Sequence, residues 1–126
     1  MTRKIIESEK APKAIGAYAP AVDLGDFVFL SGQIPLDPAT MEMVRGDIRV
    51  ETSRVLENMK AVLEAAGMTA AHVVKTTVFL VDLEDFADLN EVYGAFFGEA
   101  PPARSTIQVA ALPKGARVEI EAIARR

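Results

Sequence analysis

The chain has 126 residues, of which half are hydrophobic and a quarter are charged, a composition typical of one folded domain rather than a disordered segment. It contains no cysteine, which excludes disulfides, thiolate metal sites and cysteine nucleophiles. The formal net charge of −4 argues against a nucleic-acid groove, because phosphate binding needs clustered Lys and Arg. We therefore expect a single domain over residues 1–126 that binds no nucleic acid.

No apolar run approaches the roughly 18 residues that a membrane span needs, and residues 1–16 lack the apolar core of a signal peptide. We therefore expect a cytoplasmic protein without a membrane partner. The apolar share is high for so small a domain, which suggests that part of it lies at subunit interfaces.

The first half of the chain begins with a short strand over residues 4–7 and a loop. A hairpin is predicted next, because Gly25-Asp26 separates two apolar runs and Gly first in a two-residue loop favours a type II′ turn. Residues 27–30 are apolar on both faces, as in a buried strand. Gly32 follows this strand and indicates either a bulge at its end or backbone that closely approaches a ligand.

Two helices are predicted, one capped by Asp47 and running to about Ala66, the other starting at Asp82 and ending near Phe97. Each carries an apolar stripe at helical spacing, which we interpret as core. The stripes are Val55, Met59, Val62, Leu63 and Ala66 on the first helix, and Phe86, Leu89, Tyr93 and Phe96 on the second. His72 is the only histidine and is interpreted as a surface residue, since no second His or Cys accompanies it to bind a metal.

The strongest strand pattern covers residues 73–81, and its length and β-branched residues place it centrally in a sheet. Pro101-Pro102 stops the second helix, and strands follow at 105–109 and 117–124. This order predicts an α+β fold of two layers, in which two helices cover one face of a mixed sheet of about six strands. The strands are also apolar on the other face of the sheet, which must be shielded from water. A closed homo-oligomer is the simplest way to bury that face.

Arg104 is the first charged residue after the two prolines, and its guanidinium presents a fork of donors that fits a carboxylate. Glu119 and Glu121 share one face of the last strand, so strand parity does not choose between them. Arg104 and Glu119 could converge across adjacent strands, which would provide one group to hold an acid and one to move protons. The alternative is that both are ordinary surface charges or a structural ion pair. Tyr18 similarly lies in a loop where it either packs on the surface or belongs to a site.

Six segments, in order and at matching spacings, resemble the RidA (YjgF-type) family of enamine/imine deaminases. They are Gly16-Ala17-Tyr18-Ala19-Pro20, Ser31-Gly32-Gln33-Ile34-Pro35, Val74-Lys75-Thr76-Thr77-Val78-Phe79, Leu89-Asn90-Glu91-Val92-Tyr93-Gly94-Ala95-Phe96-Phe97, Pro102-Ala103-Arg104-Ser105 and Glu119-Ile120-Glu121-Ala122-Ile123-Ala124. The resemblance covers essentially the whole chain. It implies a chorismate-mutase-like fold and a homotrimer, with a central barrel and three sites in the clefts between subunits.

The resemblance also implies roles for individual residues. Arg104 corresponds to the Arg that binds the substrate carboxylate, Glu119 to the acid near the reacting centre, and Tyr18 to the site tyrosine. Substrate contacts are implied for Ser31, Gly32, Thr106 and Asn90. Many relatives carry Cys where this chain has Thr106, which removes any thiol-based modification but leaves a backbone N–H and a small side chain. No cofactor or metal is expected.

The implied reaction is hydrolysis of reactive 2-imino acids or their enamine tautomers, such as 2-iminobutanoate and 2-iminopropanoate, to 2-keto acids and ammonia. The competing interpretation is a non-catalytic regulatory protein that binds 2-keto acids in the same cleft, for which Arg104 suffices and Glu119 is not needed. Ribonuclease activity, also linked to relatives, fits poorly with the acidic composition and the lack of a His pair.

Overall fold

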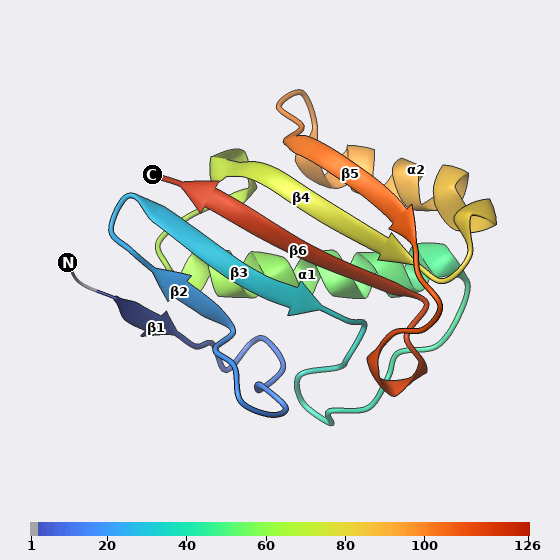
Figure 1. The fold of residues 1–126 in the computed structure, drawn as a ribbon, viewed down its shortest axis with the longest axis horizontal. Coiled ribbons are helices and arrows are strands. Elements are labelled where there is room, and N and C mark those ends of the chain that lie inside the picture. Colours follow the sequence, from blue (N-terminus) through green and yellow to red (C-terminus); the bar gives the residue numbers. More distant parts are fainter. Residues whose placement is uncertain (1–2) are drawn as a thin grey trace.

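One mixed six-stranded sheet with two α-helices on one face makes up the fold of residues 3–126, which are the residues described by this computed structural model (Figure 1). The strands are β1 (Lys4–Ile6), β2 (Ala21–Asp23), β3 (Phe27–Gln33), β4 (Val73–Leu80), β5 (Ala103–Gln108) and β6 (Val118–Arg125). Their spatial order is β1-β2-β3-β6-β4-β5; β4 and β5 run parallel, and the other neighbouring pairs run antiparallel. The two-layer α+β architecture predicted from the sequence is confirmed.

The hairpin between β2 and β3 forms at Gly25-Asp26, as predicted. The Leu24 N–H donates to the Phe27 carbonyl at 2.8 Å, which closes a two-residue loop. Gly25 adopts a φ of 99°, a conformation that only glycine reaches without strain. At the far end of β3, the pairing with β6 shifts register between Leu30 and Gln33, so the strand is irregular where Gly32 lies.

Helix α1 (Ile48–Ala65) begins and ends as the sequence predicts. The Asp47 side chain accepts hydrogen bonds from the backbone N–H groups of Arg49 and Val50, which satisfies two donors of the first turn. Gly67 follows the helix with a φ of 74°. The predicted apolar stripe is buried against the sheet. Glu51, Thr52 and Asn58 are also buried on this helix, which its apolar periodicity did not indicate.

Helix α2 (Phe86–Phe97) begins four residues later than predicted. Asp82 caps a short 3₁₀ turn, η2 (Leu83–Asp85), through a hydrogen bond from the Glu84 N–H, and the α-helix follows that turn. Leu89 and Tyr93 are buried as predicted, whereas Phe86 is 38% exposed. The assignment of Phe86 to the core is therefore wrong, and its ring is available for another contact.

Two shorter turns complete the chain, η1 (Ala70–His72) and η3 (Pro113–Gly115). His72 is partly exposed, and its Nδ1 accepts a hydrogen bond from the Thr69 N–H at 3.0 Å, which closes the η1 turn. Strand β5 starts two residues earlier than predicted, which places Arg104 inside the strand. None of the helices in residues 3–126 is both long and apolar enough to cross a membrane.

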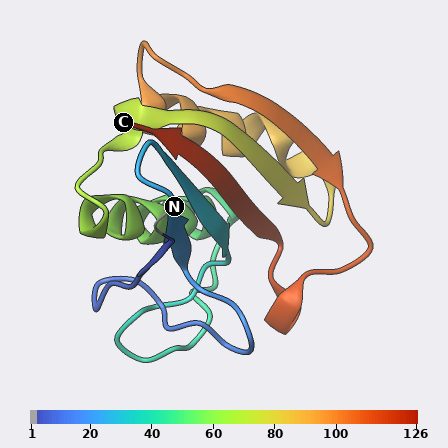
Figure 2. The same ribbon diagram turned by 60° about the vertical axis from the view of Figure 1, so that its left-hand side comes forward.

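The two faces of the sheet differ sharply. Figures 1 and 2 show α1 and α2 on the same side of the sheet, where β3 and β6 bury alternate residues such as Val28, Leu30 and Ile120. The opposite face, which we call the open face, leaves Phe27 38% and Phe29 43% exposed. These exposed rings explain why the strand patterns are apolar on both sides, and burial of the open face by another subunit stays a prediction.

Candidate functional site

A cavity of about 360 Å³ opens where the loop before β2 passes the end of β3 and the start of β6. Four residues singled out from the sequence line it: Tyr18, Ser31, Gly32 and Glu119. Its size suits a small organic acid. The tertiary fold therefore brings together residues up to 101 positions apart in the chain (18 to 119), and we call this cavity the Glu119 pocket.

Gly32 leaves room for the Glu119 carboxylate. A Cβ atom at position 32 would overlap Oε2 of Glu119 and would lie only 2.8 Å from Cδ and 3.0 Å from Cγ. Gly32 does not adopt a positive φ, so the need for glycine here is steric rather than conformational. The predicted irregularity at the end of the strand is confirmed, whereas the close approach of the Gly32 backbone to a ligand stays a prediction.

Glu119 lies half-buried between Val118 and Ile120, whose side chains point to the helix-covered face. Burial raises the pKa of the Glu119 carboxyl above its ordinary value, and the nearby charge of Glu121 raises it further. A carboxylate with a raised pKa is a better proton acceptor than a free one, which suits a general base. Glu121 is exposed and lines a separate hollow, so the two acids that strand parity could not distinguish lie in different surroundings.

Tyr18 and Ser31 connect the loop to the strand. The Ser31 hydroxyl donates to the Ala19 carbonyl at 2.6 Å, and the Ser31 N–H donates to the Pro20 carbonyl at 2.9 Å. The Tyr18 hydroxyl accepts from the Ile15 N–H at 3.1 Å and keeps its own proton free to donate. Ser31 therefore anchors the loop that carries Tyr18, while the half-exposed Tyr18 ring forms part of the pocket wall.

Arg104 lies elsewhere, on the edge strand β5 beneath α2. Its guanidinium carbon is 4.7 Å from the ring centre of Tyr93 and 5.4 Å from that of Phe86. The Tyr93 hydroxyl is in turn fixed by Thr76, at an oxygen–oxygen distance of 2.6 Å. Burial raises the pKa of the Tyr93 phenol, so this ring stays neutral. Within residues 3–126 the Arg104 guanidinium makes no hydrogen bond or ion pair, which leaves its donors free.

Two other predicted site residues lie near Arg104. Thr106 shares its strand face, and the Thr106 hydroxyl is buried without a hydrogen-bond partner among residues 3–126. Asn90 is partly buried on α2, four residues after Phe86 and three before Tyr93, so it lies on the helix face that carries those rings. Arg104, Thr106 and Asn90 thus form a second group, which we call the Arg104 group.

The expectation that Arg104 and Glu119 converge across adjacent strands is wrong within one chain. Strand β4 separates β5 from β6. Arg104 pairs with Thr76, which is buried beneath the helices, whereas Glu119 pairs with Phe79, which has the opposite parity on β4. The two side chains therefore lie on opposite faces of the sheet. Nor do they form an ion pair with each other within one chain.

Sequence reasoning missed several features around these groups. The aromatic stripe on α2 was interpreted only as core, yet Phe86 and Tyr93 are the rings beneath Arg104. The two rings are seven residues apart, about two helical turns, which places them on the same face of α2. This spacing could have predicted that both contact one side chain. Lys13 and Lys114 line the Glu119 pocket without having been singled out.

Comparison with known proteins agrees with these observations. The family model described as Endoribonuclease L-PSP matches residues 8–126. The chain belongs to this family, the RidA (YjgF-type) family. Protein DfrA of Myxococcus xanthus is 63% identical over 126 residues, covering 98% of this chain and 96% of that protein.

Solved structures of similar proteins share the fold. The crystal structure of Escherichia coli TdcF with bound serine has a TM-score of 0.93 and 52% identity, covering 98% of both chains. TdcF carries the name of a reactive intermediate deaminase. RidA from the Antarctic bacterium Psychrobacter sp. PAMC 21119 has a TM-score of 0.95 and 50% identity, covering 98% of this chain and 99% of that one. Relatives thus carry more than one functional name.

Proposed function

We propose that this protein is a hydrolytic deaminase that converts 2-imino acids and their enamine tautomers, such as 2-iminobutanoate and 2-iminopropanoate, to 2-keto acids and ammonia. The observation that carries the proposal is that one chain presents two chemically complementary groups, each without an ionic partner among residues 3–126. The Glu119 pocket offers a half-buried carboxylate with a raised pKa, and the Arg104 group offers a stacked guanidinium with free donors. The name of TdcF and the serine bound in its structure support the same class of substrate.

The two groups meet only if two chains contribute to one site. We propose a homotrimer in which the open faces surround a central barrel and each cleft joins the Glu119 pocket of one subunit to the Arg104 group of the next. Exposed apolar residues on the open face, such as Phe29 and Ile107, favour such burial. The position of Arg104 on the sheet edge favours contact with a neighbour, because β5 has no strand on its outer side.

In the proposed reaction, the Arg104 guanidinium binds the substrate carboxylate through two charge-assisted hydrogen bonds and so orients the imine carbon. Glu119 takes a proton from a water molecule and passes it to the imine nitrogen as the water oxygen forms a bond to that carbon, which gives a carbinolamine and restores the carboxylate. Glu119 then takes the hydroxyl proton of the carbinolamine and passes it to the nitrogen. The C–O double bond forms as the C–N bond breaks, which releases ammonia and the 2-keto acid. Tyr18 holds the water or the nitrogen through its free hydroxyl proton.

The alternative is a regulatory protein that binds 2-keto acids in the same cleft without turnover. Both functions need Arg104, but only hydrolysis needs a base. Glu119→Gln therefore separates them: it should abolish turnover in the deaminase while leaving keto-acid binding within a fewfold of the unaltered protein. Efficient turnover by this variant would assign water activation to another group.

The decisive experiment uses a threonine dehydratase to generate 2-iminobutanoate in the presence of semicarbazide, which traps the imine. We expect the protein to compete with the trap and to accelerate release of 2-ketobutyrate. Arg104→Ala should lose this activity, and Arg104→Lys should lose most of it, because a lysine keeps the charge without the fork. Arg49→Ala is the matched control, since Arg49 forms exposed ion pairs with Asp88 and Glu91 between the helices. Full activity in Arg104→Lys would refute the carboxylate clamp.

A further inference from the structure

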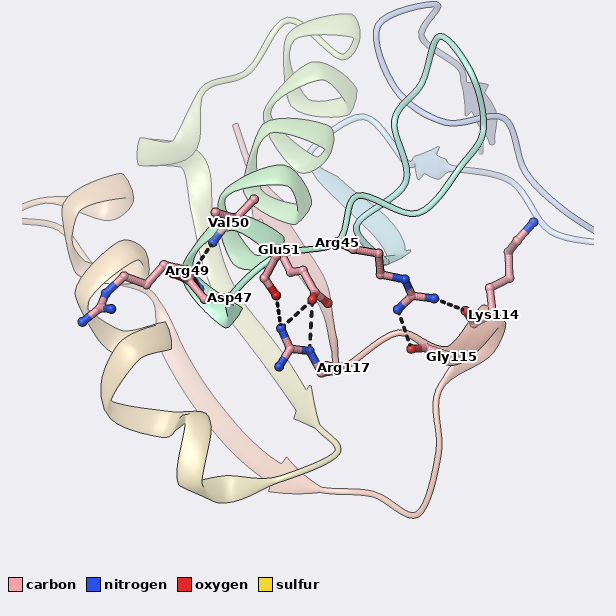
Figure 3. Close-up of polar contacts among 9 residues, drawn as sticks. Arg45, Asp47, Arg49, Val50, Glu51, Lys114, Gly115 and Arg117 are labelled. Carbon is pink, nitrogen blue, oxygen red and sulfur yellow. Dashed lines mark hydrogen bonds and ion pairs between the residues drawn. The ribbon is translucent and has the colours of Figure 1, made fainter.

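The turn η3 forms one wall of the Glu119 pocket and is held in an unusual conformation. Lys114 has a φ of 56° and a ψ of 25°, the left-handed region that residues other than Gly, Asn and Asp rarely adopt. Arg45 fixes this turn from outside the pocket. Its guanidinium donates to the Gly115 carbonyl at 3.0 Å and to the Lys114 carbonyl at 3.3 Å (Figure 3). A strained lysine backbone persists only where its surroundings determine it.

A second contact fixes the chain immediately after η3. Arg117 donates to Oε2 of Glu51 from Nε at 3.0 Å and from Nη2 at 2.6 Å, and it also donates to the Gly46 carbonyl. Glu51 is 1% exposed whereas the Arg117 side chain is 40% exposed, so the carboxylate of this ion pair is buried and its guanidinium reaches water. Figure 3 shows Arg45, before α1, joined to Lys114 and Gly115 of η3, and Arg117, before β6, joined to Glu51 in the first turn of α1. The pocket wall that carries Lys114 is therefore held at the turn itself and immediately after it.

The charges in the pocket wall are not balanced. Lys13 and Lys114 both line the cavity, and neither makes an ion pair with any residue from 3 to 126. Glu119 is the one acid among the lining residues, and the pocket is cationic although the chain carries a net charge of −4. In Figure 3 the Lys114 side chain extends away from Arg45 and Arg117, so its ammonium group is not used in the brace.

The reaction proposed above does not need Lys13 or Lys114. The substrate's own carboxylate has a partner in the free fork of Arg104, and the imine needs only Glu119 and Tyr18. Two exposed lysines that line the same cavity therefore favour a ligand with a further negative charge, beyond the group that Arg104 binds.

We propose that Lys114, assisted by Lys13, is a specificity-determining residue that binds a second carboxylate, so that the protein prefers dicarboxylic 2-imino acids to 2-iminobutanoate. This inference rests on the proposed function, because it names the substrate class of the same site. The substrates are 2-iminosuccinate and 2-iminoglutarate, which an amino-acid oxidase releases from aspartate and glutamate. Arg45 acts as a positioning residue that keeps Lys114 at the pocket wall.

The test compares kcat/KM for 2-iminoglutarate and 2-iminobutanoate, both generated by an amino-acid oxidase in the presence of semicarbazide. We expect the unaltered protein to favour the dicarboxylic substrate. Lys114→Met should lower the ratio of the two values about fivefold, the usual scale for one partly exposed ion pair, and Lys13→Met should lower it further. Lys60→Met is the matched control, because Lys60 is exposed on α1 outside the pocket, and it should leave the ratio unchanged.

Arg45→Ala tests the positioning role. We expect it to lower the same ratio while the fold is retained, and Arg45→Lys to restore part of it through one remaining hydrogen bond. The preference should also weaken with added salt, since partly exposed ion pairs are screened. An unchanged ratio in Lys114→Met, or a preference of the unaltered protein for 2-iminobutanoate, would overturn the inference.

Calorimetry separates this inference from the proposed function. The protein should bind 2-oxoglutarate more tightly than 2-oxobutanoate, and Lys114→Met should remove the difference. If no imine is hydrolysed but this difference is seen, the deaminase proposal fails and the lysine site stands. If imines are hydrolysed but the two keto acids bind equally well, the deaminase proposal stands and the second-carboxylate site is refuted.

Discussion

Gly32→Ala is the substitution that tests most directly whether Glu119 must occupy its observed position. The added Cβ would overlap Oε2 of Glu119 and come within 2.8 Å of Cδ, where ordinary contacts are 3.4 Å or more. The end of the Glu119 side chain is flexible, so it should move by about 1 Å rather than force the strands apart. A displacement of this size in a reacting group costs about 100-fold in rate.

We expect Gly32→Ala to change the stability of the protein far less than its activity. Alanine in a strand is favoured over glycine by about 0.5–1 kcal/mol, and Gly32 has no positive φ that alanine would strain. We therefore expect the free energy of unfolding of Gly32→Ala to stay within about 1 kcal/mol of the unaltered protein, because the favourable backbone term offsets the crowding. Chemical denaturation measures this value, and the semicarbazide competition assay measures kcat/KM.

Gly94→Ala is the control, because a Cβ at this exposed position of α2 would meet no atom within 4 Å. It should keep full activity and gain up to about 1 kcal/mol of stability. In a Glu119→Ala background no carboxylate remains to be crowded, so Gly32→Ala should be more favourable for the free energy of unfolding there than in the unaltered protein. Normal turnover by Gly32→Ala, or an equal change in the free energy of unfolding in both backgrounds, would refute this explanation for the glycine.

The remaining predictions concern charge and capping. Because burial and Glu121 both raise the pKa of Glu119, the acid limb of the kcat/KM profile should lie above pH 4.5, and Glu121→Gln should move it to lower pH. The same raised pKa means that Glu119 contributes stability that is present at acid pH and is lost as pH rises through its folded pKa, so Glu119→Gln should flatten that part of a stability–pH curve. Replacing Arg117 by methionine should cost about 3–5 kcal/mol in chemical denaturation, because it leaves the buried Glu51 charge unpaired, and adding Glu51→Gln should recover most of the loss. Asp47→Ala should cost about 1 kcal/mol by removing the cap of α1, which thermal unfolding would detect.

Local features were the ones that sequence reasoning predicted best. Three features depend on interactions within a few residues and can therefore be predicted from the chain alone. They are the hairpin at Gly25, the helix cap at Asp47 and the alternation of buried and exposed side chains along β6. The later start of α2 was missed because an acidic first turn is compatible with either a 3₁₀ or an α-helical hydrogen-bond pattern.

The sequence by itself determined the fold class, the family resemblance and the residue types available for chemistry. It could not determine that Arg104 and Glu119 face opposite sides of the sheet, because that depends on β4 lying between β5 and β6. Nor could it reveal the contact between Gly32 and Glu119 or the brace of Arg45 on Lys114, which join segments 87 and 69 positions apart. Strand order and register are set by the packing of the whole chain, and these decide which side chains share a pocket.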